Sequence, residues 1–245
     1  MTDVLDGLGR FPLAPAFVMV DPFGVKGLPL QLLRRLAAFP KTELLVSFMY
    51  ESISRWLAQP NYEVALDNLF GVPQWRDAEG LEGDEKKAFL SQLYATQLKG
   101  IGMDYVRLFE MGDGGNRTEY FLAFGTHSHH GLRVMKDAMW TVDPAGGVRF
   151  SDFTAPDPAQ ATLFDVEPDL IQLQGLLIDR FSGKARIPIK EIDRFVLVET
   201  AFRETHGKEV LRRLQRAEKI DADRPANRSK SFWGEGTLVT FPSAD

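Results

Sequence analysis

The chain has 245 residues, of which 44% are hydrophobic and 26% charged, a composition typical of a globular protein with one large or two smaller domains. Its net charge of −5 excludes an overall polybasic character, so binding to nucleic acid or to an anionic membrane would need a local patch. The sequence holds no cysteine, which excludes disulfides, thiolate zinc sites and cysteine nucleophiles. Because we find neither a secretory signal segment nor an apolar run of bilayer length, we expect a cytoplasmic protein without a membrane role.

The first part of the chain alternates between strand and helix patterns. The apolar run 16–20 has no polar residue, which predicts a strand buried on both faces. A loop with three glycines between two later strand patterns predicts a hairpin. In chain order we predict a strand at 16–20, a helix at 28–38, a strand at 42–49, a helix at 51–58, a helical insertion at 60–100 that ends in a helix at 84–99, strands at 105–109 and 119–124, and a helix at 128–140.

Two parallel strand–helix units followed by an antiparallel pair predict a mixed α/β sheet with right-handed connections. A class I methyltransferase sheet ends in this order, with its fourth and fifth strands followed by a hairpin. Any three-layer α/β protein with an antiparallel edge would show the same pattern, and this alternative stays open. We therefore predict that residues 1–142 form a partial methyltransferase-like (Rossmann) half-domain.

The composition changes near Asp143, where several prolines and glycines predict a linker over 143–165. Beyond it, helical patterns cover 170–181, 188–198 and 205–219, and a strand pattern covers 237–241. Three helices followed by a hairpin over about 75 residues match the outline of a winged helix-turn-helix domain. We therefore predict a winged-helix-like domain at 166–245.

The third of these helices predicts a nucleic-acid contact. At 100° per residue one stripe of the helix is basic, whereas the opposite side, with Val210, Leu211, Leu214 and Ala217, is apolar. A helix of this kind can pack inward and lie along phosphates. The alternatives are a solvated surface or protein docking. The candidate residues are Lys208, Arg212, Arg216 and Lys219 on the helix, with Arg228 and Lys230 in the following loop.

The turn Asp21–Pro22–Phe23 follows the first predicted strand directly. It is similar to the Asp/Asn-Pro-Pro-Tyr/Phe turn of amino-methyltransferases, in which an acidic or amide group accepts hydrogen bonds from the target amino group and an aromatic ring stacks on a flipped base. Gly24 stands where an aromatic residue is usual, and Phe23 lies one place early. A structural alternative is that Asp21 caps the next helix and Gly24 adopts a positive φ.

Other polar residues favour structural interpretations. His127, His129 and His130 are too closely spaced to converge on one tetrahedral ion, so we expect no metal. Arg55 follows the second predicted strand, and Arg117 precedes the second strand of the predicted hairpin. Each could pair with a carboxylate or hold an anionic ligand. No Walker A sequence and no Gly-x-Ser-x-Gly elbow occurs, so an ATPase or a serine hydrolase has no support.

Several longer segments together are similar to one family. They are residues 17–24, 47–49 with Arg55, 116–122, 131–132 with 135–140, and the C-terminal helices, covering nearly the whole chain from about Phe11. These segments resemble the three-Cys-motif partner (TcmP) family. The resemblance implies a Rossmann, methyltransferase-like domain followed by a winged helix, and a partner with a radical-SAM-like three-Cys motif.

Family members also carry an N-terminal part with a Gly-rich turn, and that part binds most of S-adenosylmethionine. The turn is not in this sequence, so the resemblance implies S-adenosylmethionine for a longer form and no cofactor for this chain alone. The sequence therefore favours a methyltransferase-like partner of a radical-SAM-like protein in nucleic-acid modification or defence, with Asp21, Pro22 and Phe23 positioning an amino-bearing target. The alternative is a non-catalytic adaptor that binds nucleic acid or protein, and we expect this chain alone to be inactive.

Overall fold

The structure is a computed structural model that describes residues 14–22, 28–113, 117–151, 168–226, 228–229 and 232–243. The chain divides into two compact units, Met1–Met135 with Val148–Thr162, and Lys136–Gly147 with Leu163–Asp245. The boundary between them falls inside one helix, α6 (His129–Val142). Of the predicted linker 143–165, residues 152–165 lie outside the described residues, and Arg149–Ser151 form a strand.

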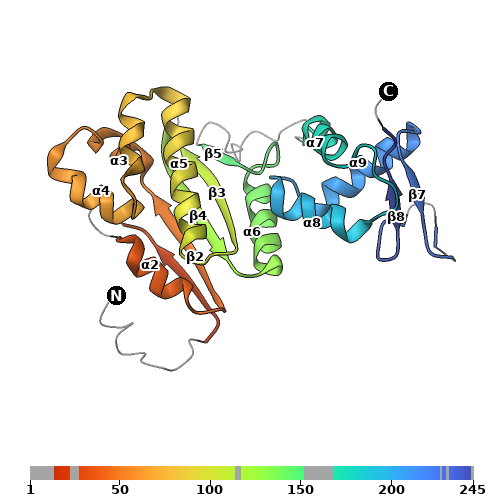
Figure 1. Cartoon of the computed structure of the whole chain (residues 1–245), viewed down its shortest axis with the longest axis horizontal. Helices are drawn as coiled ribbons and strands as arrows, with labels where there is room; N and C mark the ends of the chain where they lie inside the picture. Colours follow the sequence, from red (N-terminus) through yellow and green to blue (C-terminus); the bar gives the residue numbers. More distant parts are fainter. Residues whose placement is uncertain are drawn as a thin grey trace, which may run out of the picture. The chain divides into compact units, whose positions relative to one another are not determined.

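The first unit combines a five-stranded sheet with helices, so the predicted α/β class with a mixed sheet is confirmed (Figure 1). Its elements before α6 are β1 (Ala16–Val20), α2 (Leu30–Ala37), β2 (Thr42–Phe48), α3 (Tyr50–Trp56), the 3-10 turn η2 (Pro60–Tyr62), α4 (Glu63–Phe70), the 3-10 segment η3 (Pro73–Gly80), α5 (Gly83–Gly100), β3 (Tyr105–Gly112) and β4 (Thr118–Thr126); β5 (Arg149–Ser151) follows α6.

The strand order is β1-β2-β4-β3-β5. β1 pairs with β2 in parallel and β3 with β5 in parallel, whereas β4 is antiparallel to both of its neighbours. Four strands of the sheet therefore run in one direction, and β4 alone runs against them. As a result, the carboxyl ends of β1, β2, β3 and β5 lie at the same edge of the sheet.

One face of the sheet forms the core of the first unit. Leu44, Val46 and Phe48 alternate along β2 and are at most 1% exposed. They pack in one apolar cluster with residues of α2, α4 and α5. Leu90 and Tyr94 of α5 are four residues apart, which places both on the buried side of that helix. The Phe48 and Tyr94 rings stack with centroids 4.5 Å apart, so the second strand and the longest helix are joined by direct aromatic contact.

The opposite face is covered unevenly. α6 begins on this face, where the Cα of Gly131 lies so close to Glu43 and Thr126 that a Cβ would meet the Glu43 carboxylate. At the edge strand β1, however, Phe17 is 54% and Met19 60% exposed. The prediction that 16–20 is buried on both faces is therefore wrong for one face. A continuous apolar run identifies the strand but does not reveal that the strand lies at an edge of the described sheet.

The second unit contains α7 (Ile171–Phe181), β6 (Ile187–Pro188), α8 (Ile189–Glu199), α9 (Glu204–Arg216), β7 (Asp221–Asp223) and β8 (Leu238–Thr240). β8 lies between β6 and β7 and is antiparallel to both. The three predicted helices are found with ends shifted by up to three residues. One apolar cluster joins the three helices to β8 and to the loop that precedes it.

The end of α6 completes this second core. The buried Lys136 ammonium donates to the backbone oxygens of Val196, Leu197 and Thr200, over 2.9, 3.0 and 3.1 Å. These oxygens lie at the end of α8, where helix carbonyls have no intrahelical partner. The Trp140 indole donates to the oxygen of Ala201 (2.9 Å). In the segment Met135–Trp140, one of those that resemble the TcmP family, Lys136 and Trp140 thus stabilise the core of the second unit.

His206 of α9 belongs to the same core. Its ring contacts the Trp140 ring edge-on, with centroids 4.3 Å apart, and it is 6% exposed. Burial, followed by the positive charges of Arg203 and Lys136, lowers the pKa of His206 to about 4. The side chain is therefore a neutral core residue at physiological pH.

Candidate functional site

The carboxyl edge of the sheet brings several polar residues together. In open α/β sheets ligands bind outside the carboxyl ends of the strands. Asp21 directly follows β1 and is exposed, and Pro22 beside it is half-buried. Phe23 lies outside the described residues, so the geometry of the complete Asp21–Pro22–Phe23 turn is not defined. Tyr50 begins α3 at the end of β2, and the hairpin between β3 and β4 turns at the same edge.

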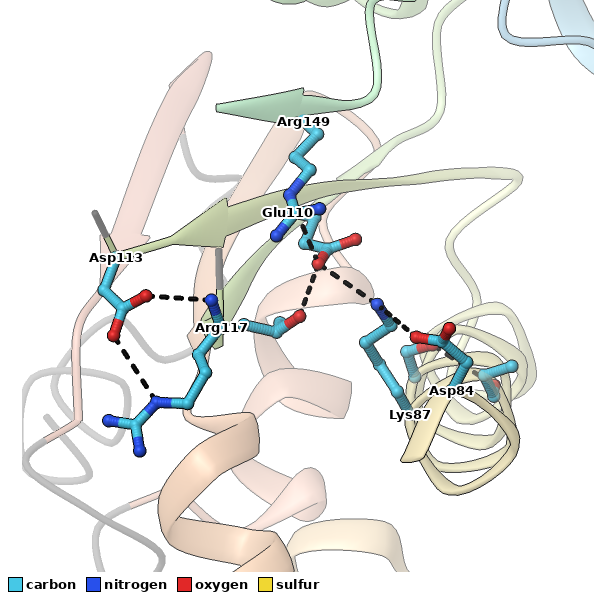
Figure 2. A network of polar contacts seen from close by, with 9 residues as sticks. Asp84, Lys87, Glu110, Asp113, Arg117 and Arg149 are labelled. Atoms are coloured by element: carbon cyan, nitrogen blue, oxygen red, sulfur yellow. Dashed lines mark hydrogen bonds and ion pairs between the residues drawn. The ribbon is translucent and has the colours of Figure 1, made fainter. Parts of the chain in front are cut away.

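A charged network occupies the part of this edge next to β5 (Figure 2). The Glu110 carboxylate, 16% exposed, lies 3.3 Å from the Lys87 ammonium and 3.5 Å from Nε of Arg149. It also accepts a hydrogen bond from the Thr118 hydroxyl. Lys87 contacts Asp84 as well, over 2.9 Å. Burial lowers the pKa of Lys87, but the hydrogen bond to Asp84 and the charge of Glu110 outweigh it, so the pKa is raised.

This network joins α5, β3, β4 and β5, and its charges neutralise one another. The network was not predicted from the sequence, because the predicted strand ended at Phe109 and left Glu110 outside it. A predicted strand that extended to Gly112, as β3 does, would have placed the charged Glu110 on the inward face of the sheet. A charged residue in that position indicates that it has a partner of opposite charge. The network fits a structural role better than a catalytic one.

Arg117 and Arg55 are both paired with carboxylates. The backbone N–H of Arg117 donates to Asp113 over 2.8 Å, and its guanidinium lies 3.4 Å from the same carboxylate (Figure 2). The guanidinium also lies 3.8 Å from Glu51. Arg55 donates to Glu51 over 2.9 Å. Of the two alternatives for these arginines, the geometry shows carboxylate pairing. Both guanidinium groups are largely exposed, so each pair contributes at most about 1 kcal/mol.

Tyr120 is a second residue at this edge that sequence reasoning missed. Its pKa is raised by burial and then by the negative charges of Asp21 and Glu119. The edge therefore carries the exposed Asp21 carboxylate and the half-buried Tyr120 phenol.

The basic stripe of α9 is partly neutralised. Lys208 lies 3.7 Å from Asp193 of α8, and Arg212 lies 3.2 Å from Glu209. Arg216 and Lys219 are exposed, and neither has a carboxylate within 4.0 Å in the described part of the chain. Lys219 lies beyond the end of the helix at Arg216, so the predicted stripe is shorter than 205–219. The apolar side is buried except for Ala217.

The loop before β8 carries the remaining predicted residues. The Arg228 guanidinium lies over the Phe232 ring, 4.8 Å from its centroid, and Lys230 is outside the described residues. Arg224, which was not predicted, donates to the oxygen of Phe232 over 2.8 Å and lies 4.6 Å from the centroid of a Trp233 ring. Arg224 therefore fixes this loop, and Arg228 remains at the surface.

The histidine cluster is divided between separate contacts. His127 bonds with Asp104 over 3.2 Å and with the oxygen of Ala37 over 3.0 Å. His129 bonds with the Tyr105 hydroxyl over 2.7 Å. Within the described ranges, no three or more His, Asp and Glu side chains form a group that could hold a metal ion. Within the same ranges, no helix is long and apolar enough to cross a membrane.

Comparison of the chain with protein-family models, with curated proteins and with solved structures finds no match. The geometry of the two units is therefore what supports a function.

Proposed function

We propose that the chain is a methyltransferase-like adaptor that binds nucleic acid through its second unit and presents it to a radical-SAM-like three-Cys-motif partner. The observation that carries this proposal is the order α7, β6, α8, α9, β7, β8, with β8 between the other two strands. This is the order of a winged helix, in which the third helix and the hairpin contact nucleic acid. The proposed role is in nucleic-acid modification or defence.

Charge supports the same assignment. Residues 171–243 contain 14 Lys and Arg but 10 Asp and Glu, whereas the whole chain has a net charge of −5. This stretch is basic in an acidic protein, although the whole second unit, 136–147 with 163–245, carries 15 Lys and Arg and 16 Asp and Glu. The local excess from α7 to β8 favours contact with phosphates through this stretch. On α9, Arg212 is half-exposed and Arg216 exposed, next to a side that is buried in the core. Arg228 extends the basic surface from the adjacent loop.

An adaptor fits the carboxyl edge better than an enzyme does. Glu110, Lys87, Arg117 and Arg149 all have partners of opposite charge there. S-adenosylmethionine would need a glycine-rich cradle at the end of a strand. The described turns after β1 and β2 contain Asp21–Pro22 and Met49 instead. The described part of these turns contributes no glycine to such a cradle, which supports the adaptor, and no step is assigned to the methyl donor.

Methyl transfer itself is the second candidate, and one observation favours it. Asp21 follows the edge strand of a sheet in which two parallel strands precede an antiparallel hairpin, the order with which a class I methyltransferase sheet ends. In such an enzyme Asp21 would accept a hydrogen bond from the target amino group. Calorimetric titration with S-adenosylmethionine tests this candidate: heat of binding would favour the enzyme, and no heat at millimolar donor would favour the adaptor.

Binding to a random-sequence duplex tests the leading proposal. We expect the double variant Arg212→Gln/Arg216→Gln to weaken binding and to lower the slope of log K against log salt by about 2, because roughly one counterion is released per phosphate contact. The matched control is Arg34→Gln/Lys99→Gln, which removes two exposed cations from the first unit. Equal affinity and equal slope for the two double variants would exclude α9 as the contact helix.

A further inference from the structure

Two arginines of the second unit lie outside the predicted basic stripe and resemble Arg216 and Lys219, its two members without a carboxylate partner in the described residues. Lys208 and Arg212 have carboxylates within 4.0 Å. Arg180 at the end of α7 and Arg194 on α8 are exposed and have no such carboxylate among the residues that the structure describes. An exposed guanidinium that is not paired with a carboxylate can donate its N–H groups to another anion.

Both arginines line the same groove. The cavity has a volume of about 670 Å³, and its lining comes from α7, β6 and α8, with no contribution from α9. Phe181 and Phe195 form its apolar part, with their rings edge-to-face and 5.4 Å between centroids. The Arg180 guanidinium lies 6.0 Å from the centre of the Phe195 ring. The groove therefore carries two guanidinium groups that have no carboxylate partner in the described residues, over two phenylalanine rings that are largely buried, 1% and 9% exposed.

We propose that this groove binds the phosphate group of a nucleotide unit, with Arg180 and Arg194 as its donors. Guanidinium groups bind phosphate oxygens by paired, charge-assisted hydrogen bonds. A volume of several hundred Å³ is the size range of small-ligand sites and accommodates one nucleotide. The nucleotide is either free or part of a nucleic-acid strand, since both present the same group. The site goes beyond the proposed function, because it uses no residue of the α9 surface.

The acidic residues of the groove limit its affinity. Glu191 and Glu199 line it together with the two arginines, and Lys190 is engaged with Glu235 at 2.5 Å. Each unpaired carboxylate repels a phosphate. A phosphate site here therefore responds in opposite directions to the loss of an arginine and to the loss of a glutamate. A purely structural role of these exposed residues would give no such response.

Binding of adenosine monophosphate to the full chain, followed by NMR or calorimetry, tests the proposal, with adenosine as the probe that lacks phosphate. We expect adenosine monophosphate to bind and adenosine to bind at least about tenfold more weakly. Arg194→Gln and Arg180→Gln should each weaken binding of the nucleotide by roughly tenfold, whereas Glu191→Gln should strengthen it by roughly threefold. Arg34→Gln on α2, which removes an exposed arginine of the first unit, is the matched control and should leave nucleotide binding unchanged.

Oligonucleotides with and without a 5′-phosphate identify the source of the phosphate. Tighter binding of the phosphorylated strand than of adenosine monophosphate indicates a strand end, and equal binding indicates a free nucleotide; both outcomes require loss with Arg194→Gln. Equal binding of adenosine and adenosine monophosphate, or no difference between Arg194→Gln and Glu191→Gln, would overturn the proposal. The α9 variants test duplex binding separately, so either proposal can fail without the other.

Discussion

Replacing the buried Lys136 by methionine tests how the second unit is held together. The side chain is 2% exposed, and its three N–H donors meet three backbone oxygens at the end of α8. Hydrogen bonds from a charged donor contribute about 1.5–3 kcal/mol each, and burial of the ammonium costs several kcal/mol. We expect Lys136→Met to lower the unfolding free energy of the second unit by about 2–4 kcal/mol, because carbonyls at a helix end lose their charged donor.

Hydrogen exchange of the full chain, resolved by peptide, measures this effect unit by unit. Protection should fall in α8 and α9 and stay unchanged in α5 of the first unit. Lys99→Met is the matched control, because Lys99 lies in the last turn of a helix but is exposed. A loss below about 1 kcal/mol for Lys136→Met, equal to that of the control, would refute the view that the ammonium stabilises the end of α8.

Three further changes have defined outcomes. The pKa of His206 is about 4 in the folded chain and 6.5 for an unperturbed histidine, as in the unfolded chain. The unfolding free energy of the second unit should therefore rise by up to about 3 kcal/mol from pH 4 to pH 6.5, and in urea unfolding His206→Gln should flatten this rise. Gly131→Ala should cost about 1–2 kcal/mol because its Cβ would displace the Glu43 carboxylate, whereas Gly175→Ala, with nothing within 4 Å, should gain about 0.5–1 kcal/mol in the same unfolding assay. Tyr94→Phe should leave the unfolding free energy of the first unit unchanged or raise it by about 1 kcal/mol, because the fully buried hydroxyl has no hydrogen-bond partner in the described residues; a loss above 1 kcal/mol in thermal unfolding would contradict this.

The positions of the main elements followed from local patterns. Apolar runs predicted β1 and β2, and leucines at helical spacing predicted α2 and α5, with ends within about two residues of those found. The three-glycine loop correctly indicated that β3 and β4 are neighbours. These signals are local because backbone period and turn chemistry depend on adjacent residues. β5 was missed, since three residues carry no measurable period.

The candidate sites were less predictable than the elements. The predicted helical spacing of the basic residues on α9 was correct, but Asp193 on α8 neutralises Lys208. The groove with Arg180 and Arg194 joins two helices that gave no functional signal in the sequence. An ion pair between separate elements depends on how those elements pack, and no local pattern contains that information.

The sequence by itself determined which segments are strands and helices, that the sheet is mixed, and that one stripe of the α9 segment is basic, because composition and period follow directly from residue order. Only the tertiary structure decided that β4 lies between β2 and β3, that Phe17 and Met19 are exposed on an edge strand, and which cations are left without a carboxylate. These properties depend on contacts between residues far apart in the chain, where geometry decides which side chains meet.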